Sequence, residues 1–163
     1  MTPPSASTPS LPSLGLLSQL DESVRRTLAA AGRFETLPVD TRLATQGHAH
    51  HTLAILLSGR ASVHCHANSD YVHLADIGPG ETIGEMNMID PQKASADVVV
   101  TEKAEAWIID SDQFQAIVER DPYCAYAVMH WLARELCRRL RQNAEHMLRQ
   151  AAEHRSHLRD MDY

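Results

Sequence analysis

The chain has 163 residues, 44% of them hydrophobic, which is enough for one domain with a packed core together with a tail or a long helix. A formal net charge of −6 argues against a general DNA binder. The chain has no apolar run of eighteen residues, which argues against a membrane-spanning protein, and its N-terminus lacks the basic and then apolar regions of a signal peptide. Three widely spaced cysteines, Cys65, Cys124 and Cys137, argue against a disulfide framework and predict a cytoplasmic protein.

The N-terminal region begins with a Pro-, Ser- and Thr-rich stretch, residues 1–12, which has no apolar periodicity and is typical of a flexible leader. Apolar residues at helical spacing follow, including Val24 and Leu28, and predict a short helical segment over about residues 14–31. Gly32 comes directly after this segment and is a suitable C-terminal cap.

From Phe34 the pattern changes to short apolar runs separated by turn signals, which is typical of a β-sandwich or a barrel-like roll. The apolar positions are Leu37, Val39, Leu43, Leu53, Ile55, Leu57, Ala61, Val63, Val72, Leu74, Val98, Val99, Val100, Trp107, Ile108 and Ile109. The turn signals are Gln46-Gly47, Ser58-Gly59, Asn68-Ser69-Asp70 and Gly78-Pro79-Gly80. We therefore expect an α+β fold, an antiparallel β-roll that is jelly-roll-like, in a domain of residues 13–121 with flanking helices.

Two helices are predicted after the roll, the first a short one over residues 112–118. Asp121 and Pro122 then open a long helix, because Asp suits the N-cap and Pro suits the first helical position. No Pro or Gly interrupts the rest of the chain, so we expect this helix to occupy residues 122–158 and a tail to occupy residues 159–163.

The long helix carries a seam with alternating steps of three and four residues, the spacing of a coiled-coil core. The seam consists of Tyr126, Met129, Ala133, Leu136, Leu140, Asn143, Met147, Gln150 and His154. We expect its apolar early half to pack on the roll and its more polar later half to pair with a second chain, giving a homodimer. Packing of the helix on its own domain alone is the alternative.

The same helix is basic, with seven arginines against three glutamates from Arg134 to Arg159, a balance of +4. The rest of the chain therefore sums to −10, given the total of −6. A solvated face of mixed charge explains this balance more simply than an acidic protein partner or nucleic acid does.

Four pieces of sequence, in order and at consistent spacing, carry a family resemblance. They are Gln46-Gly47 with Leu53–Val63, then Ile77-Gly78-Pro79-Gly80-Glu81-Thr82-Ile83-Gly84-Glu85-Met86, then Trp107-Ile108-Ile109-Asp110, and finally Asp112, Phe114 and Asp121-Pro122. Together they resemble the cyclic nucleotide-binding domain of the catabolite activator class over about residues 14–150. The resemblance implies a regulatory β-roll with a phosphate-binding cassette, here residues 77–96.

The resemblance also implies which residues of the cassette contact a ligand. These positions are Ile83, Gly84, Glu85, Met86, Lys93, Ala94, Ser95 and Ala96. Gly84 lets the backbone approach a ligand closely because it has no Cβ, and Glu85 matches a carboxylate that accepts a hydrogen bond from the ribose 2′-hydroxyl. Ser95 matches a hydroxyl residue that helps hold the phosphate, and Ala96 fits the tight packing there. Without the surrounding motif, Gly84 and Ser95 would be interpreted as ordinary turn residues.

Ala94 departs from the family pattern, in which an arginine follows Gly84-Glu85 at this distance and pairs with the cyclic phosphate. An arginine offers a bidentate, charge-assisted pair that alanine lacks. Lys93 is the adjacent cation, and it either reaches the phosphate as a point charge or points to solvent, the interpretation we favour.

Asn143 is a further candidate, because the resemblance places it where a polar residue of the long helix reaches the nucleotide base. A polar seam residue that sets the register of a dimer is an equal alternative.

Histidines gather at two places, His48, His50 and His51 in one predicted loop and His64 and His66 on one face of a predicted strand. Their spacing matches no zinc signature, so we expect solvated side chains and no metal site, with zinc or haem as the alternative.

The sequence therefore predicts a non-enzymatic regulatory module that senses a nucleotide-like ligand, with no cofactor other than a possible cyclic nucleotide. No nucleophile–base arrangement or triphosphate-binding loop is recognisable. The alternative is a dimeric protein-interaction scaffold that binds no ligand. Direct DNA binding is not expected, because residues 157–163 are too few for a helix-turn-helix domain.

Overall fold

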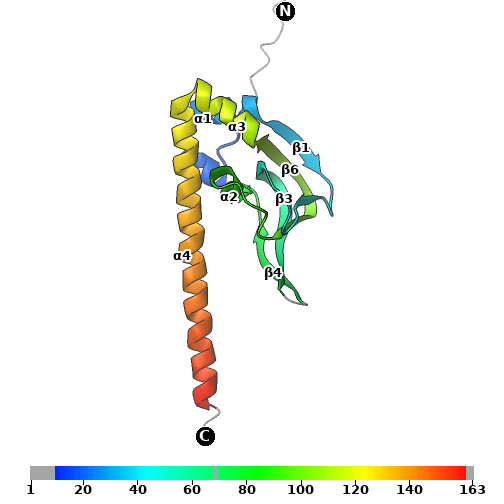
Figure 1. Cartoon of the computed structure of the whole chain (residues 1–163), viewed down its shortest axis with the longest axis vertical. Helices are drawn as coiled ribbons and strands as arrows, with labels where there is room; N and C mark the ends of the chain where they lie inside the picture. Colours follow the sequence, from blue (N-terminus) through cyan, green and yellow to red (C-terminus); the bar gives the residue numbers. More distant parts are fainter. Residues whose placement is uncertain (1–9, 68–69, 161–163) are drawn as a thin grey trace, which may run out of the picture. The chain divides into compact units, whose positions relative to one another are not determined.

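The computed structural model describes residues 10–67 and 70–160 (Figure 1). The chain separates into two compact units, Met1–Trp131 with the sheet and most helices, and Leu132–Tyr163 with the greater part of the last helix. Most of the expected leader, residues 1–9, and the end of the expected tail, residues 161–163, lie outside the described residues. Leu11, at the described start of the chain, is buried.

The predicted N-terminal helical segment is confirmed as a 3₁₀ turn, η1 (Gly15–Gln19), followed by a helix, α1 (Glu22–Ala31). Gly32 does cap α1, and its N–H donates to the carbonyl of Leu28 at 3.1 Å, but its φ of −97° is not left-handed. A Cβ at Gly32 would lie 2.6 Å from the carbonyl oxygen of Ile108 and from the indole of Trp107. Glycine is therefore required here by space and not by backbone conformation.

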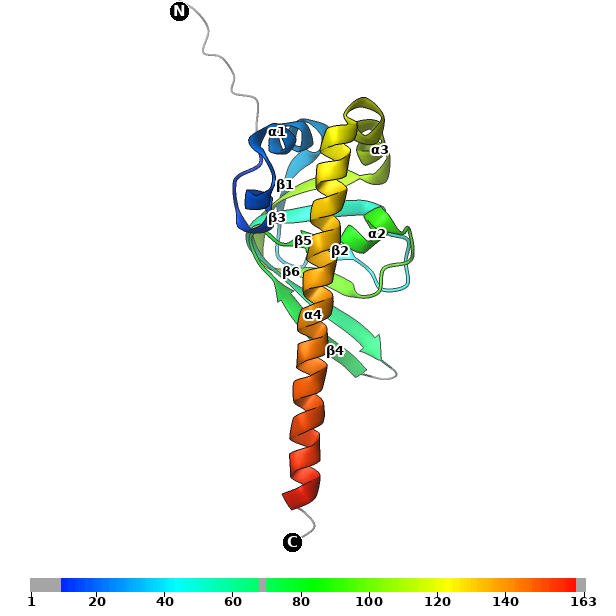
Figure 2. The same ribbon diagram turned by 90° about the vertical axis from the view of Figure 1, so that its left-hand side faces the viewer.

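The roll consists of antiparallel strands, as predicted. The strands are β1 (Arg33–Leu37), β2 (Arg42–Ala44), β3 (Thr52–Ala67), β4 (Asp70–Ile77), β5 (Thr82–Ile83) and β6 (Asp97–Asp110). Their order is β1-β6-β3-β4, with β2 paired to β6 and β5 paired to β3. Figures 1 and 2 show the long strands β3 and β6 side by side at the centre of this arrangement.

The predicted turn at Ser58-Gly59 is wrong, because β3 continues through it. The register between β3 and β6 shifts around Ser58 and Arg60, which marks an irregularity of the β-bulge kind. Gly59 has a φ of 77°, and a Cβ there would lie 2.4 Å from the carbonyl oxygen of Lys103 on β6. The glycine thus bends a strand against its neighbour instead of ending it. Strand β6 is likewise long, and it contains both the valine run, residues 98–100, and the apolar run that begins at Trp107.

The inner face of the roll holds a cluster of small and branched apolar side chains. It consists of Leu37, Ala44, Ala54, Leu56, Ala61, Ile77, Ile83, Ala94, Val98, Val100, Ala104, Ala106 and Ile108. Three residues of the cassette, Ile77, Ile83 and Ala94, belong to this cluster. The core that stabilises the fold therefore also positions the cassette.

Both helices predicted after the roll are confirmed, as α3 (Ser111–Arg120) and α4 (Pro122–Asp160). Asp110 and Gln113 form a reciprocal capping box at the start of α3. Asp121 caps α4, since its Oδ1 accepts a hydrogen bond from the N–H of Cys124 at 3.0 Å. No helix in the described part of the chain combines the length and hydropathy needed to span a membrane.

The two faces of α4 differ sharply in exposure. In the first unit, Cys124, Val128 and Trp131 are buried. The predicted seam lies on the other face, where Tyr126 is 69% exposed and Leu140 and Met147 are each 68% exposed. The early seam residue Tyr126 thus does not pack on the roll as expected, because the buried stripe of α4 is offset from the seam.

Candidate functional site

The cassette begins with a tight turn that is hydrogen-bonded to β3. The N–H of Gly80 donates to the carbonyl of Leu56 at 2.7 Å, and the N–H of Leu56 donates to the carbonyl of Glu81 at 3.1 Å. Strand β5 then pairs with β3, with Ile83 opposite Ala54. These contacts fix where the chain reaches Gly84.

Gly84 lies between β5 and the short helix α2 (Glu85–Ile89) in a left-handed conformation, with φ of 86°. A Cβ at this position would lie 2.1 Å from the carbonyl oxygen of Thr52 and 2.4 Å from Nε2 of His50. Both the backbone conformation and the close packing therefore require glycine. The groups closest to this side of Gly84 are the carbonyl of Thr52, on β3, and the imidazole of His50.

The side chains on either side of Gly84 point in different directions. Ile83 is buried in the core, and Glu85 is 4% exposed, whereas Met86 is exposed. The carboxylate of Glu85 acts electrostatically on the imidazole of His50. A buried carboxylate, the group expected to contact a ribose, thus follows the turn directly.

The second half of the cassette is held by the loop that carries the histidines. The N–H of Ala94 donates to the carbonyl of His48 and the N–H of Gly47 donates to the carbonyl of Ala94, both at 2.8 Å. Ala94 is 7% exposed and Ala96 is also buried, whereas Lys93 and Ser95 are exposed. The position of the expected arginine is therefore occupied by the buried methyl group of Ala94. The side chain of Lys93 is exposed to solvent instead of lying in the core.

Asp97 ties this loop to the neighbouring strands. Its buried carboxylate accepts a hydrogen bond from the N–H of Gln46 at 2.8 Å and pairs with Arg42 at 3.0 Å. The side chain of Gln46 in turn accepts a hydrogen bond from the N–H of His66, on β3, at 2.7 Å. The Gln46 N–H, with help from Arg42, holds the pKa of Asp97 below its ordinary value of 3.8 despite burial.

Replacing Asp97 is expected to weaken the fold in a pH-dependent way. A carboxyl whose pKa is lowered on folding stabilises the protein above its ordinary pKa, and this contribution is lost as the pH falls through the lowered value. Asp97→Asn should therefore lower the free energy of unfolding by about 1–3 kcal/mol at pH 7. The difference from the unmodified protein should shrink as the pH falls below 3.8, which urea denaturation at several pH values measures. Asp76→Asn, at an exposed carboxylate paired with His73, is the control and should change stability less.

The interpretation of the loop histidines as solvated is wrong for one of them. His48 and His51 are exposed, but His50 is 9% exposed and lies against the Gly84 turn. Burial is the main cause that lowers the pKa of His50 below 6.5. No local pattern in the sequence distinguishes His50 from its neighbours, because its burial depends on the cassette that covers it.

The second group of histidines forms a stack of rings on the β3–β4 hairpin. The rings of His64 and Tyr71 are parallel with centroids 4.6 Å apart, and His66 and His73 contact the same pair. Across residues 10–67 and 70–160, no three His, Cys, Asp or Glu side chains are grouped so as to hold a metal ion. These rings contact one another and Tyr71, while His73 also pairs with Asp76 and His66 with Asp97.

Asn143, the candidate for contacting a base, lies on α4 in the second unit and is exposed. Within the same unit, Glu135 pairs with Arg138 and Arg139. Burial opposes ionisation of Glu135, but hydrogen bonds from the two guanidinium groups lower its pKa overall.

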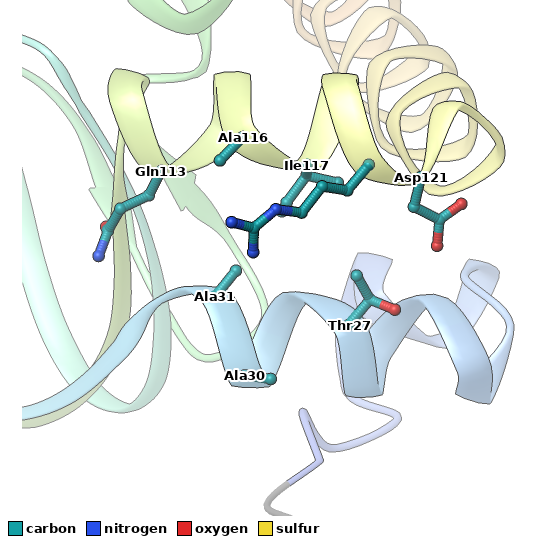
Figure 3. A pocket seen from close by; sticks show the side chains of 8 residues that line it. Thr27, Ala30, Ala31, Gln113, Ala116, Ile117 and Asp121 are labelled. Atoms are coloured by element: carbon teal, nitrogen blue, oxygen red, sulfur yellow. The ribbon is translucent and has the colours of Figure 1, made fainter.

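A separate hollow of about 510 Å³ lies between α1 and α3 (Figure 3). Thr27, Ala30 and Ala31 of α1 face Gln113, Ala116 and Ile117 of α3 across it, near Asp121 (Figure 3). No residue of the cassette lines this hollow. It is therefore distinct from the predicted ligand site.

Comparison with known proteins agrees with the fold. Residues 34–121 match the cyclic nucleotide-binding domain family. A cyclic AMP receptor protein from Thermus thermophilus is 34% identical over 98 residues, which are 60% of this chain and 44% of that protein. The chain therefore matches less than half the length of this curated relative.

Two solved structures share the fold of most of this chain. A cyclic nucleotide-binding domain from Methylobacillus flagellatus superposes with a TM-score of 0.76 at 25% identity, over 80% of this chain and 74% of that one. The catabolite activator protein of Thermus thermophilus superposes with a TM-score of 0.69 at 27% identity, over 81% of this chain and 61% of that one. The antiparallel roll and its flanking helices are thus features of a shared fold. The chain belongs to the cyclic nucleotide-binding domain family.

Proposed function

We propose that this chain is a regulatory module with a degenerate phosphate-binding cassette, which senses a nucleotide-like ligand and relays its binding through α4. The ligand would lie against Ile83–Met86 and Lys93–Ala96. The observation that carries the proposal is the combination of an intact Gly84 turn and a buried Glu85 with a core methyl group at Ala94. The Gly84 turn and the carboxylate of Glu85 could accommodate a ribose. The lack of a guanidinium at Ala94 should lower the affinity for the phosphate of such a ligand.

Calorimetric titration with cyclic AMP, cyclic GMP and a cyclic dinucleotide tests this proposal. Losing a charge-assisted partner costs about 3–5 kcal/mol, and each 1.4 kcal/mol is about tenfold in affinity. We therefore expect dissociation constants that are about a hundred- to several-thousand-fold weaker than those of a cassette with arginine. Absence of heat from all three ligands at millimolar concentration would refute the sensor.

A ligand-independent dimeric scaffold is the second candidate, and the exposed seam of α4 favours it. Leu140 and Met147 lie seven residues apart on this seam and are both largely exposed in the single chain. Large exposed apolar side chains at heptad spacing are typical of a helix that pairs with another. The same seam would serve the sensor, since a dimer helix can transmit a change at the cassette.

Leu140→Glu is expected to dissociate a dimer formed through this seam. Two glutamates facing each other in an apolar seam are both desolvated and repelled, so dimer affinity should fall at least a hundredfold, or by about 3 kcal/mol. Analytical ultracentrifugation over a range of concentrations measures the change. Ala152→Glu, at an exposed position outside the seam, is the matched control and should leave the dimer unchanged. A dimer that persists in Leu140→Glu would place the interface elsewhere.

A further inference from the structure

The charge of the cassette does not suit a phosphate at neutral pH. Residues 77–96 contain the carboxylates Glu81, Glu85 and Asp90 against a single cation, Lys93. Lys93 is exposed, and its backbone pairs with Ala49, so its neighbour Ala94 faces the core in its place. A phosphate held at this turn would therefore need positive charge from a residue outside the cassette.

His50 is the residue that the fold brings to this position. Its Nε2 lies 2.4 Å from the point where a Cβ of Gly84 would be, so the imidazole contacts the turn on its inner side. It is 9% exposed, and its Nε2 is 3.5 Å from Oγ1 of Thr52. Because this site is largely shielded from water, an imidazolium there would attract a nearby bound anion more strongly than it would in bulk water.

The groups that surround His50 come from three elements. Glu85 of α2 acts on it to favour the charged imidazole, and His51 of its own loop acts to disfavour it. On β3, a hydrogen bond with Thr52 favours the charged form, while burial opposes it and is the largest effect. Asp110, opposite Thr52 on β6, uses its carboxylate to cap α3. The balance leaves His50 mostly neutral at pH 7 without ligand.

We infer that protonation of His50 supplies the positive charge that Ala94 cannot. Binding of a phosphate-bearing ligand is then coupled to the uptake of one proton by this imidazole. This inference rests on the proposed function, because it assumes that the ligand lies against the Gly84 turn. It makes the module a sensor of ligand and of acidity together.

The coupling has a definite sign. An anionic ligand that favours the charged imidazole raises the pKa of His50, and by linkage protonation raises the affinity for the ligand. Between the pKa values of the free and the bound protein, affinity should rise by up to about tenfold for each unit by which the pH falls.

Titration of the full chain with cyclic AMP at pH 5.5, 6.5 and 7.5 tests the inference, with adenosine as the matched neutral probe. We expect the affinity for cyclic AMP to rise at least tenfold from pH 7.5 to pH 5.5, and that for adenosine to change less than threefold. His50→Gln keeps a polar side chain of similar size but carries no charge, so it should abolish the pH dependence. The controls His48→Gln and His51→Gln, at exposed positions of the same loop, should retain it.

A second measurement does not depend on how His50→Gln folds. Nuclear magnetic resonance of the imidazole carbons follows the titration of each histidine in the unmodified protein. The pKa of His50 should rise when cyclic AMP is added, while those of His48 and His51 should stay within experimental error.

The outcomes separate the inference from the proposed function. Binding of cyclic AMP with no pH dependence, or with the same pH dependence in His50→Gln, overturns the role of His50 and leaves the sensor intact. Absence of binding by every cyclic nucleotide at all three pH values overturns both. A pH dependence that adenosine shares would also overturn the inference, because it would not report a charge acting on phosphate.

Discussion

Gly84→Ala is expected to destabilise the protein more than any other single methyl addition in the cassette. A left-handed conformation costs a residue with a Cβ about 1–2 kcal/mol. Placing the new methyl group 2.1 Å from the carbonyl oxygen of Thr52 adds overpacking of about 1–3 kcal/mol. Thr52 belongs to β3 and cannot move without breaking its pairing with β6. The free energy of unfolding should therefore fall by about 2–5 kcal/mol, as measured by urea denaturation.

Two other glycines separate the causes of this effect. Gly47 has a similar φ of 77° and no atom within 4 Å of a built Cβ, so Gly47→Ala should show the backbone cost alone, about 1–2 kcal/mol. Gly32 has an ordinary φ but would place a Cβ 2.6 Å from a carbonyl oxygen, so Gly32→Ala should show overpacking alone. Equal losses in Gly84→Ala and Gly47→Ala would show that the contact with Thr52 is not tight.

Ala94→Arg is expected to produce the largest change in ligand affinity. The substitution restores a bidentate, charge-assisted donor beside the Gly84 turn, which should strengthen binding of cyclic AMP about a hundred- to several-thousand-fold. The substitution also has a cost in stability, because a long side chain replaces a buried alanine of the core cluster, and overpacking of this kind costs about 1–3 kcal/mol. Calorimetric titration of the variant against the unmodified protein measures the gain.

The control for this variant is Ala94→Met, which adds a long side chain without charge. It should not increase the affinity for cyclic AMP, and any gain that it shared with Ala94→Arg would reflect packing instead of charge. A folded Ala94→Arg protein that binds no better would mean that the pocket differs from its relatives by more than one residue. A permanent guanidinium should also reduce the pH dependence attributed to His50, because the phosphate would no longer need the imidazolium.

Local signals in the sequence were sufficient for the start of α4, and the family resemblance was sufficient to single out Gly84. Asp121 and Pro122 begin α4 as predicted, because capping depends on side chains within three residues of the helix end. The capping box of Asp110 and Gln113 at the start of α3 is equally local, although it was not predicted. Gly84 was identified from the sequence through the family resemblance, and its left-handed conformation before α2 leaves few alternatives to glycine. These features were determined by the sequence alone.

Long-range packing decided the rest. Ser58-Gly59 has the composition of a turn, but Gly59 lies within a continuous β3 because β6 approaches it closely on one side. The sequence offers no local difference between His48, His50 and His51. Only His50 is buried, because the cassette covers it in the folded chain. Asp97 becomes the anchor of the histidine loop through partners, Gln46 and Arg42, that lie more than fifty residues away in the sequence. Burial and charge depend on which distant segments meet, so the tertiary structure alone determined these roles.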